Sequence, residues 1–153
     1  MDNKEQLEKE LVNFLIGYIP VPWIEIVYHA QCDGTMWAYF YAFRVEATNM
    51  VITLDSFYNR YDRYNYDKMD AKSRLMDYAR IFYDNCPELS ETVNGYELVC
   101  KINKDGGYKF DYIHISSDRH EQLSREIILE KYLGSEYYFV PEKFPSTKYI
   151  LYS

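Results

Sequence analysis

The sequence predicts an α+β fold: an antiparallel β-sheet of about five strands backed by helices, in the order α-β-β-β-α-β-β-α plus a C-terminal tail. Three observations lead to this prediction. Apolar residues recur with helical spacing near the start, in the middle and in the later part of the chain. Two alternating segments each contain a glycine turn, as β-hairpins do. No repeat or linker divides residues 1–153, so we expect a single domain.

The first predicted helix covers the residues before two prolines. Its apolar residues follow the spacing i, i+4, i+7, i+8 and i+11, which places them on one stripe of an α-helix. They are Leu7, Leu11, Phe14, Leu15 and Tyr18. Pro20 and Pro22 end the helix because proline has no N–H group to donate inside it.

Residues 23–43 predict a β-hairpin. Asp33-Gly34 is a two-residue turn signal of the type I′ kind. This turn sets large side chains opposite each other on one face, in the pairs Ala30–Trp37, Tyr28–Tyr39, Ile26–Tyr41 and Ile24–Phe43. The other face mixes charged and apolar residues, including Glu25 and His29, so we expect it to be partly exposed. Residues 49–55, NMVITLD, predict a third strand.

The second predicted helix follows a tyrosine-rich segment. Asp67 is a candidate N-cap, because its carboxylate suits the free N–H groups of a first turn. The apolar stripe consists of Leu75, Met76, Ala79, Phe82 and Tyr83. The pair Cys86-Pro87 ends the helix.

Residues 96–116, YELVCKINKDGGYKFDYIHIS, predict a second hairpin. A two-residue turn would place Ile102 opposite a lysine or an aspartate. A three-residue turn at 105–107, with Gly107 in the left-handed region, instead places Ile102 opposite Phe110 and Cys100 opposite Tyr112. We prefer this second arrangement.

The third helix is expected to start near Asp118, because Asp118 and Glu121 have the spacing of a capping box, and to end at Gly134. Its inward-facing residues are expected to be Leu123, Ile127, Ile128 and Tyr132. The tail that follows is aromatic and contains prolines, which favours a segment lying across the domain.

The chain is acidic, with a formal charge of −7 from 24 acidic and 17 basic residues. This charge disfavours direct binding to nucleic acid and favours basic partners. Its three cysteines are widely spaced and indicate neither a disulfide framework nor a zinc site. No segment has the roughly 18 consecutive apolar residues of a membrane span. The N-terminal residues lack the features of a signal peptide, so we expect a cytoplasmic protein with no membrane partner.

No catalytic pattern stands out in the sequence. HEQLS at 120–124 begins like the zinc-protease motif HExxH but has Ser124 in place of the second histidine. Asp111 and His114 lie three residues apart on a predicted strand, and so on opposite faces. We therefore expect no enzymatic activity, no catalytic residues, no cofactor and no metal site.

The segment 55–70, DSFYNRYDRYNYDKMD, combines tyrosines with charged residues. Tyrosine and arginine are enriched among the interface residues that contribute most to protein binding. The alternative is a surface loop whose rings fold back onto the domain, and tyrosine also suits strands of the sheet. As candidate partner-binding residues we take Tyr58, Tyr61, Asp62, Tyr64, Tyr66 and Asp67, together with Glu136, Tyr137 and Tyr138 of the tail.

Two passages, IPVPWIEIVYHAQCDG (19–34) and YKFDYIHIS…REIILEKYLG (108–134), resemble YezG-like immunity proteins. Trp23, Asp33 and Gly34 match that pattern as residues that form the fold. The resemblance implies a bacterial antitoxin that binds a cognate secreted toxin, commonly a nuclease, and blocks it. The second helix departs from the family pattern, since it contains arginines where a strongly acidic helix is usual, and no tryptophan follows it.

A secretion chaperone is the alternative function. Type III-like chaperones are also small and acidic and share the predicted order of elements, but they act as homodimers that hold an unfolded effector segment. The surplus aromatic residues of this chain are tyrosines rather than leucines and methionines, which favours the antitoxin. The sequence leaves its oligomeric state open.

Overall fold

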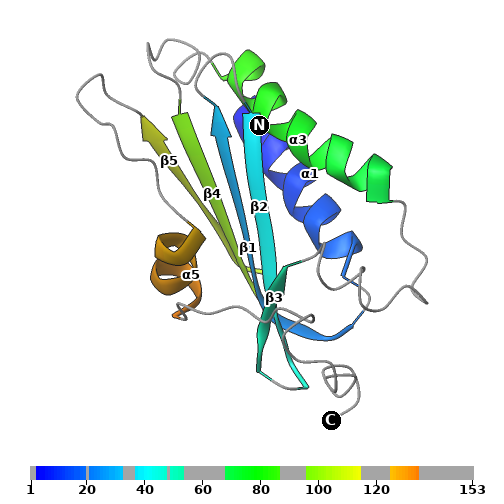
Figure 1. Ribbon diagram of the computed structural model, residues 1–153. Coiled ribbons are helices and arrows are strands. Elements are labelled where there is room, and N and C mark those ends of the chain that lie inside the picture. The colour runs from blue at the N-terminus through cyan, green and yellow to red at the C-terminus, as the bar shows by residue number, and fades with distance from the viewer. Residues whose placement is uncertain are drawn as a thin grey trace.

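The computed structural model describes residues 3–19, 21–32, 37–47, 49–53, 68–86, 96–114 and 125–134. Within these ranges, five strands form one antiparallel sheet with three helices against it (Figure 1). The elements are α1 (Asn3–Gly17), β1 (Trp23–Cys32), β2 (Trp37–Val45), β3 (Val51–Thr53), α3 (Lys68–Asn85), β4 (Tyr96–Asn103), β5 (Tyr108–His114) and α5 (Arg125–Leu133). The predicted α+β class and element order are confirmed. The expected tail lies outside the described residues.

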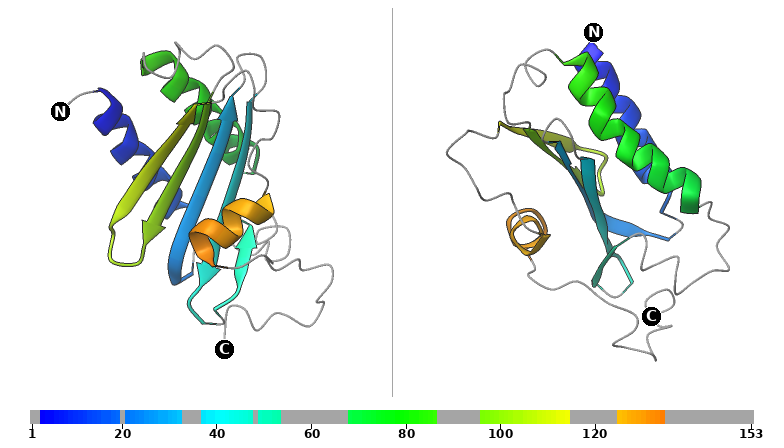
Figure 2. Two further views of the ribbon diagram at one scale, coloured as in Figure 1. Left: turned by 90° about the vertical axis from the view of Figure 1, so that its left-hand side faces the viewer. Right: turned by 45° about the horizontal axis from the view of Figure 1, so that its top comes forward.

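The sheet separates two layers of helix. Helices α1 and α3 lie side by side over one face, and α5 lies against the other (Figure 2). The strand order is β3-β2-β1-β4-β5, so β1 is central and joins the two hairpins. No helix within the described ranges is long and apolar enough to cross a membrane.

Each face of the sheet has its own apolar cluster. We call the cluster under α1 and α3 the large core and the cluster under α5 the small core. The buried residues of the large core are Leu11, Val12, Phe14, Leu15, Ile26, Tyr28, Ala30, Tyr41, Phe43, Val45, Ile52, Leu75, Ala79, Phe82, Cys86, Tyr96, Leu98, Cys100 and Ile102. Those of the small core are Val27, Phe40, Ala42, Val51, Val99, Ile128, Leu129 and Leu133.

The apolar stripes of α1 and α3 pack as their spacing predicts. Helix α1 buries Leu11 and Leu15 completely, and α3 buries Ala79 and Phe82 completely. Met76 is partly buried. The stripe residues therefore face the sheet, as expected for amphipathic helices covering one face.

Three buried tyrosines of the sheet also reach the main chain of the helix layer. Tyr28 donates a hydrogen bond of 2.5 Å from its hydroxyl to the carbonyl oxygen of Leu75. Tyr41 donates to the carbonyl of Leu15, and Tyr96 donates to that of Ala79. Each phenol thus adds an apolar ring to the core while its one polar atom has a partner, as a buried tyrosine requires.

The first hairpin has a different register from the predicted one. Tyr28 lies opposite Tyr41 rather than Tyr39, and Ile26 lies opposite Phe43 rather than Tyr41. The last pair is Cys32 with Trp37, which leaves residues 33–36 between the strands instead of a two-residue Asp33-Gly34 turn. The predicted faces survive because a shift of two residues keeps every side chain on its own side of the sheet.

The second hairpin is shifted in the same way. Ile102 lies opposite Tyr108, and Cys100 lies opposite Phe110. The amide of Gly106 donates to the carbonyl of Asn103 at 2.9 Å, and Gly106 has a φ of 91°. This is a three-residue loop at 104–106 with its left-handed position at Gly106, so the prediction of 105–107 with Gly107 left-handed was wrong by one residue.

Helix α5 covers the face of the sheet that was expected to be partly exposed. The expectation holds in part: Glu25 and Gln31 are half-buried and Ala38 is exposed, whereas Val27, His29, Phe40 and Ala42 are buried. Ile128 is buried as predicted, whereas Ile127 points outward and is 48% exposed, against prediction. The helix ends as predicted at Gly134, whose φ of 66° suits glycine after a helix. The expected start near Asp118 lies outside the described residues.

Candidate functional site

The predicted partner-binding residues lie outside the described part of the chain. This holds for Tyr58, Tyr61, Asp62, Tyr64, Tyr66 and Asp67, and for Glu136, Tyr137 and Tyr138. Their roles stay predictions. The structure does describe the elements on which the two segments begin, because residues 54–67 follow β3 and residues 135–138 follow α5.

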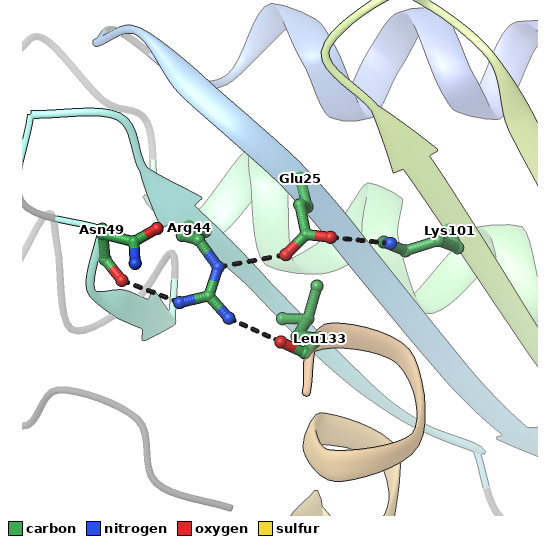
Figure 3. A network of polar contacts seen from close by, with 5 residues as sticks. All are labelled: Glu25, Arg44, Asn49, Lys101 and Leu133. Carbon is green, nitrogen blue, oxygen red and sulfur yellow. Dashed lines mark hydrogen bonds and ion pairs between the residues drawn. The ribbon is translucent and has the colours of Figure 1, made fainter. Parts of the chain in front are cut away.

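Arg44 of β2 binds both the turn that precedes β3 and the end of α5. Its guanidinium donates from Nη1 to the carbonyl of Asn49 at 2.7 Å and from Nη2 to the carbonyl of Leu133 at 2.5 Å (Figure 3). Asn49 lies two residues before β3, and Leu133 is the last residue of α5. One side chain therefore fastens the end of α5 to the turn that leads into β3. We call Glu25, Arg44, Asn49, Lys101 and Leu133 the Arg44 hub.

Glu25 of β1 holds Arg44 in this position. Its carboxylate lies 3.0 Å from Nε of Arg44 and 2.9 Å from Nζ of Lys101. Burial raises the pKa of Glu25, but the hydrogen bonds and positive charges of Lys101 and Arg44 outweigh burial and leave that pKa below its ordinary value. The carboxylate therefore stays ionised between its two cations, and Arg44 keeps its other N–H groups for the carbonyls.

Local backbone geometry explains why Arg44 can reach both carbonyls. The strand register places Arg44 opposite Glu25 on one side and opposite Val51 on the other. Asn49 has a φ of 61°, a left-handed conformation that asparagine adopts more readily than most residues. The main-chain N–H of Asn49 donates to the carbonyl of Val45 at 2.8 Å, which closes the turn between β2 and β3 beside Arg44.

A second polar group lies on the same face of the sheet. His29 Nε2 lies 3.1 Å from Oε1 of Glu97, and Gln31 donates from its amide to the same oxygen at 2.9 Å. Glu97 is fully buried, and the side chain of His29 is 5% exposed. A histidine–carboxylate pair has the chemistry of general acid–base catalysis, but this pair is enclosed and a substrate has no access to it in this conformation.

Asp111 makes a third polar contact on this face. The hydroxyl of Tyr132 in α5 donates to its carboxylate at 2.7 Å. Burial, and then the hydrogen bond to Asp111, raise the pKa of the Tyr132 hydroxyl above its ordinary value. The contact ties α5 to β5, as Arg44 ties it to β2. Asp111 thus positions a helix.

Neither Arg44 nor its partners was singled out in the sequence. The available signal was weak: a charged residue within each of three mostly apolar strands, namely Glu25 in β1, Arg44 in β2 and Lys101 in β4. Two of the acceptors are main-chain carbonyls, which no side-chain motif reveals. Among the described residues, no group of three or more histidine, cysteine, aspartate or glutamate side chains is arranged to hold a metal ion.

Comparison with known proteins adds no family to this description. No protein-family model matches the chain, and a search of curated proteins finds no match. The resemblance to YezG-like immunity proteins therefore stays a prediction from the two passages quoted above.

Proposed function

We propose that this chain is an immunity protein, an antitoxin that binds a cognate secreted bacterial toxin and neutralises it, with a basic nuclease domain as the expected target. The observation that carries the proposal is the Arg44 hub. Arg44 binds the end of α5, from which residues 135–138 follow, and the turn before β3, the strand from which residues 54–67 follow. Elements held together in this way favour tight recognition by the segments that follow them, because less ordering is left to the moment of binding.

The distribution of charge supports the same proposal. The described ranges contain 13 acidic and 12 basic residues, whereas the rest of the sequence contains 11 acidic and 5 basic ones. The folded framework is thus nearly neutral, and the negative charge belongs to the segments between and after its elements. A nuclease is basic around its substrate groove, so the net negative charge of the chain as a whole would steer it toward that groove.

The tyrosines divide in a similar way. Ten of the 18 lie in the described ranges. Of these ten, five use their hydroxyls to join elements of the fold: Tyr28, Tyr41, Tyr96, Tyr112 and Tyr132. The remaining eight of the 18 tyrosines lie in the segments proposed to bind the partner and in the tail. The framework thus accounts for four of the six tyrosines in its strands, while the proposal gives a use to those of segment 55–67.

The test is binding to the folded toxin domain encoded beside this chain. Co-purification at a one-to-one ratio and protection of cells that express the toxin are expected. The double variant Tyr61→Ala/Asp62→Ala should weaken binding by about a hundredfold, as loss of central anchor residues does. The control Asp77→Ala/Asp84→Ala removes two negative charges from α3 and should change affinity little. Unchanged binding in the first variant would remove segment 55–67 from the interface.

The same experiment separates the antitoxin from a secretion chaperone. An antitoxin binds its partner as a folded domain and abolishes its activity. A chaperone prefers an unfolded effector segment and leaves the folded domain alone. Binding that requires denatured partner, with no protection of cells, would contradict the proposed function.

A further inference from the structure

Strand β5 is one edge of the sheet and is long enough to bind another strand. It spans Tyr108–His114, whereas β3 at the opposite edge has three residues. Within the described ranges, β5 pairs with β4 alone. Unpaired N–H and C=O groups along such an edge form a template for a further strand.

The ladder between β4 and β5 shows which residues of β5 turn their main chain outward. The amide of Asn103 donates to the carbonyl of Gly107 at 2.8 Å, so Gly107 faces β4. Main-chain direction alternates along an antiparallel strand, so Lys109 and Asp111 also face β4. The N–H and C=O groups of Tyr108, Phe110 and Tyr112 therefore point to the open edge.

The two faces of β5 differ in chemistry. Tyr108, Phe110 and Tyr112 form a row of rings on the large-core side, with centroids 5.7 Å and 6.2 Å apart. Tyr108 at the outer end of this row is 39% exposed. On the opposite side, the Lys109 side chain is 77% exposed and the Asp111 side chain 29% exposed. Lys109 Nζ lies 3.7 Å from Oδ1 of Asp111, so the edge carries one cation and one anion that are paired along the strand in the single chain.

We propose that β5 pairs with β5 of a second copy of this chain, antiparallel and centred on Phe110. In this register, Lys109 of each copy lies opposite Asp111 of the other, which gives two ion pairs. Each Tyr108 lies opposite a Tyr112, and the two Phe110 rings lie opposite each other. The outward main-chain groups of Tyr108, Phe110 and Tyr112 meet as hydrogen-bonded pairs.

Charge selects this register over its neighbours. A slip that moves the centre to Lys109 places the two lysines opposite each other, and a slip to Asp111 places the two aspartates opposite each other. Like charges directly opposite are destabilising. The edge is therefore self-complementary in one alignment, as the shared surface of a twofold dimer must be. The two sheets join into one, and the helix pairs of both copies lie on the same side.

The test uses charge reversal in the full-length chain. Sedimentation should give twice the chain mass of 18.4 kDa for the wild type and the single-chain mass for Lys109→Asp and for Asp111→Lys. Mixing these two variants should restore a dimer, because the introduced aspartate of one chain would then lie opposite the introduced lysine of the other. The control Lys9→Asp, the same charge change on the exposed side of α1, should leave the dimer intact.

Amide exchange gives an independent measurement. The amides of Tyr108, Phe110 and Tyr112 should become more protected as wild-type concentration rises, and should not do so in Lys109→Asp. A wild type that stays monomeric at all concentrations, or a dimer that survives Lys109→Asp, would overturn the proposal. So would a mixture of the two variants that stays monomeric. A monomeric wild type would indicate that Lys109 instead protects the edge against strand pairing. None of these outcomes depends on the toxin.

Discussion

The two faces of the sheet are attached to their helices by different chemistry. On the large-core side, α1 and α3 bury a broad apolar surface, and tyrosine hydroxyls bind helix carbonyls. On the small-core side, α5 contributes three buried apolar side chains, and charged groups complete the attachment through Arg44 and Asp111. The apolar contribution scales with buried area, so α5 depends much more on its polar contacts than α1 and α3 do.

This difference predicts two levels of stability within the described fold. The helix pair and sheet should unfold together, because their core is shared. Helix α5 buries three apolar side chains against the sheet, fewer than α1 and α3 together. We therefore expect α5 to lie near the low end of local stability. Conditions that weaken ion pairs should therefore loosen α5 before they affect the rest, and with it the support of the proposed binding segments.

The largest effect is expected from the large core. Phe82→Ala removes a fully buried ring whose centroid lies 6.0 Å from the ring centroid of Phe110. It should lower the free energy of unfolding by about 3–5 kcal/mol, as phenylalanine truncation in a core does. Urea denaturation measures this change. Ile127→Ala on the exposed side of α5 is the control and should change stability by less than about 0.5 kcal/mol.

The second effect concerns the buried pair beneath the small-core face. His29→Leu leaves the buried carboxylate of Glu97 with Gln31 but without its histidine partner, which should cost about 3 kcal/mol. Adding Glu97→Gln removes the stranded charge and should recover more than half of that loss. Equal stability of the single and double variants would show that the charge of Glu97 has little part in the cost.

A smaller effect is expected at the Arg44 hub. Arg44→Lys keeps the positive charge near Glu25 but lacks the planar fork that reaches both carbonyls. It should destabilise the domain by about 1 kcal/mol, the typical net value of a hydrogen bond or two. Faster amide exchange in α5, with α3 unchanged, is the specific readout. An equal increase of amide exchange in α3 and α5 would contradict the separate attachment of α5.

The smallest effect is the pH dependence contributed by Glu25. Its pKa is lower in the folded protein than the ordinary value of 4.5. Its stabilising contribution is therefore complete above pH 4.5 and is lost as the pH falls through the folded pKa. Urea midpoints measured on both sides of this window should fall on acidification, and Glu25→Gln should make the fall shallower. An identical pH profile in Glu25→Gln would exclude this contribution.

The sequence revealed which residues face each layer but not how the strands align. Alternation placed Tyr28, Ile102 and Cys100 on the buried side correctly, because that pattern has a period of two. Both hairpins were nevertheless misaligned by two residues. A shift of two leaves the apolar pattern intact, so only the loop can fix the register, and in the second hairpin the left-handed glycine was Gly106 rather than Gly107.

The candidate site was less accessible from the sequence. The partners of His29 and Glu25 could not be read from the sequence because they are distant: Glu97 is 68 residues from His29, and Lys101 is 76 residues from Glu25. Arg44 binds the carbonyl of a residue 89 positions away. Such contacts depend on the order of strands in the sheet, which local periodicity does not encode. The partner-binding residues lie outside the described part and stay predictions.

The tyrosine hydroxyls on Leu75 and Ala79 also limit how α3 can move. These two carbonyls lie four residues apart, and their donors come from the adjacent strands β1 and β4. Sliding α3 along its axis by a fraction of its roughly 5.4 Å pitch would strand two buried phenols at once. Movement of α3 along its axis is therefore unfavourable. This side of the molecule would resist deformation by a bound protein.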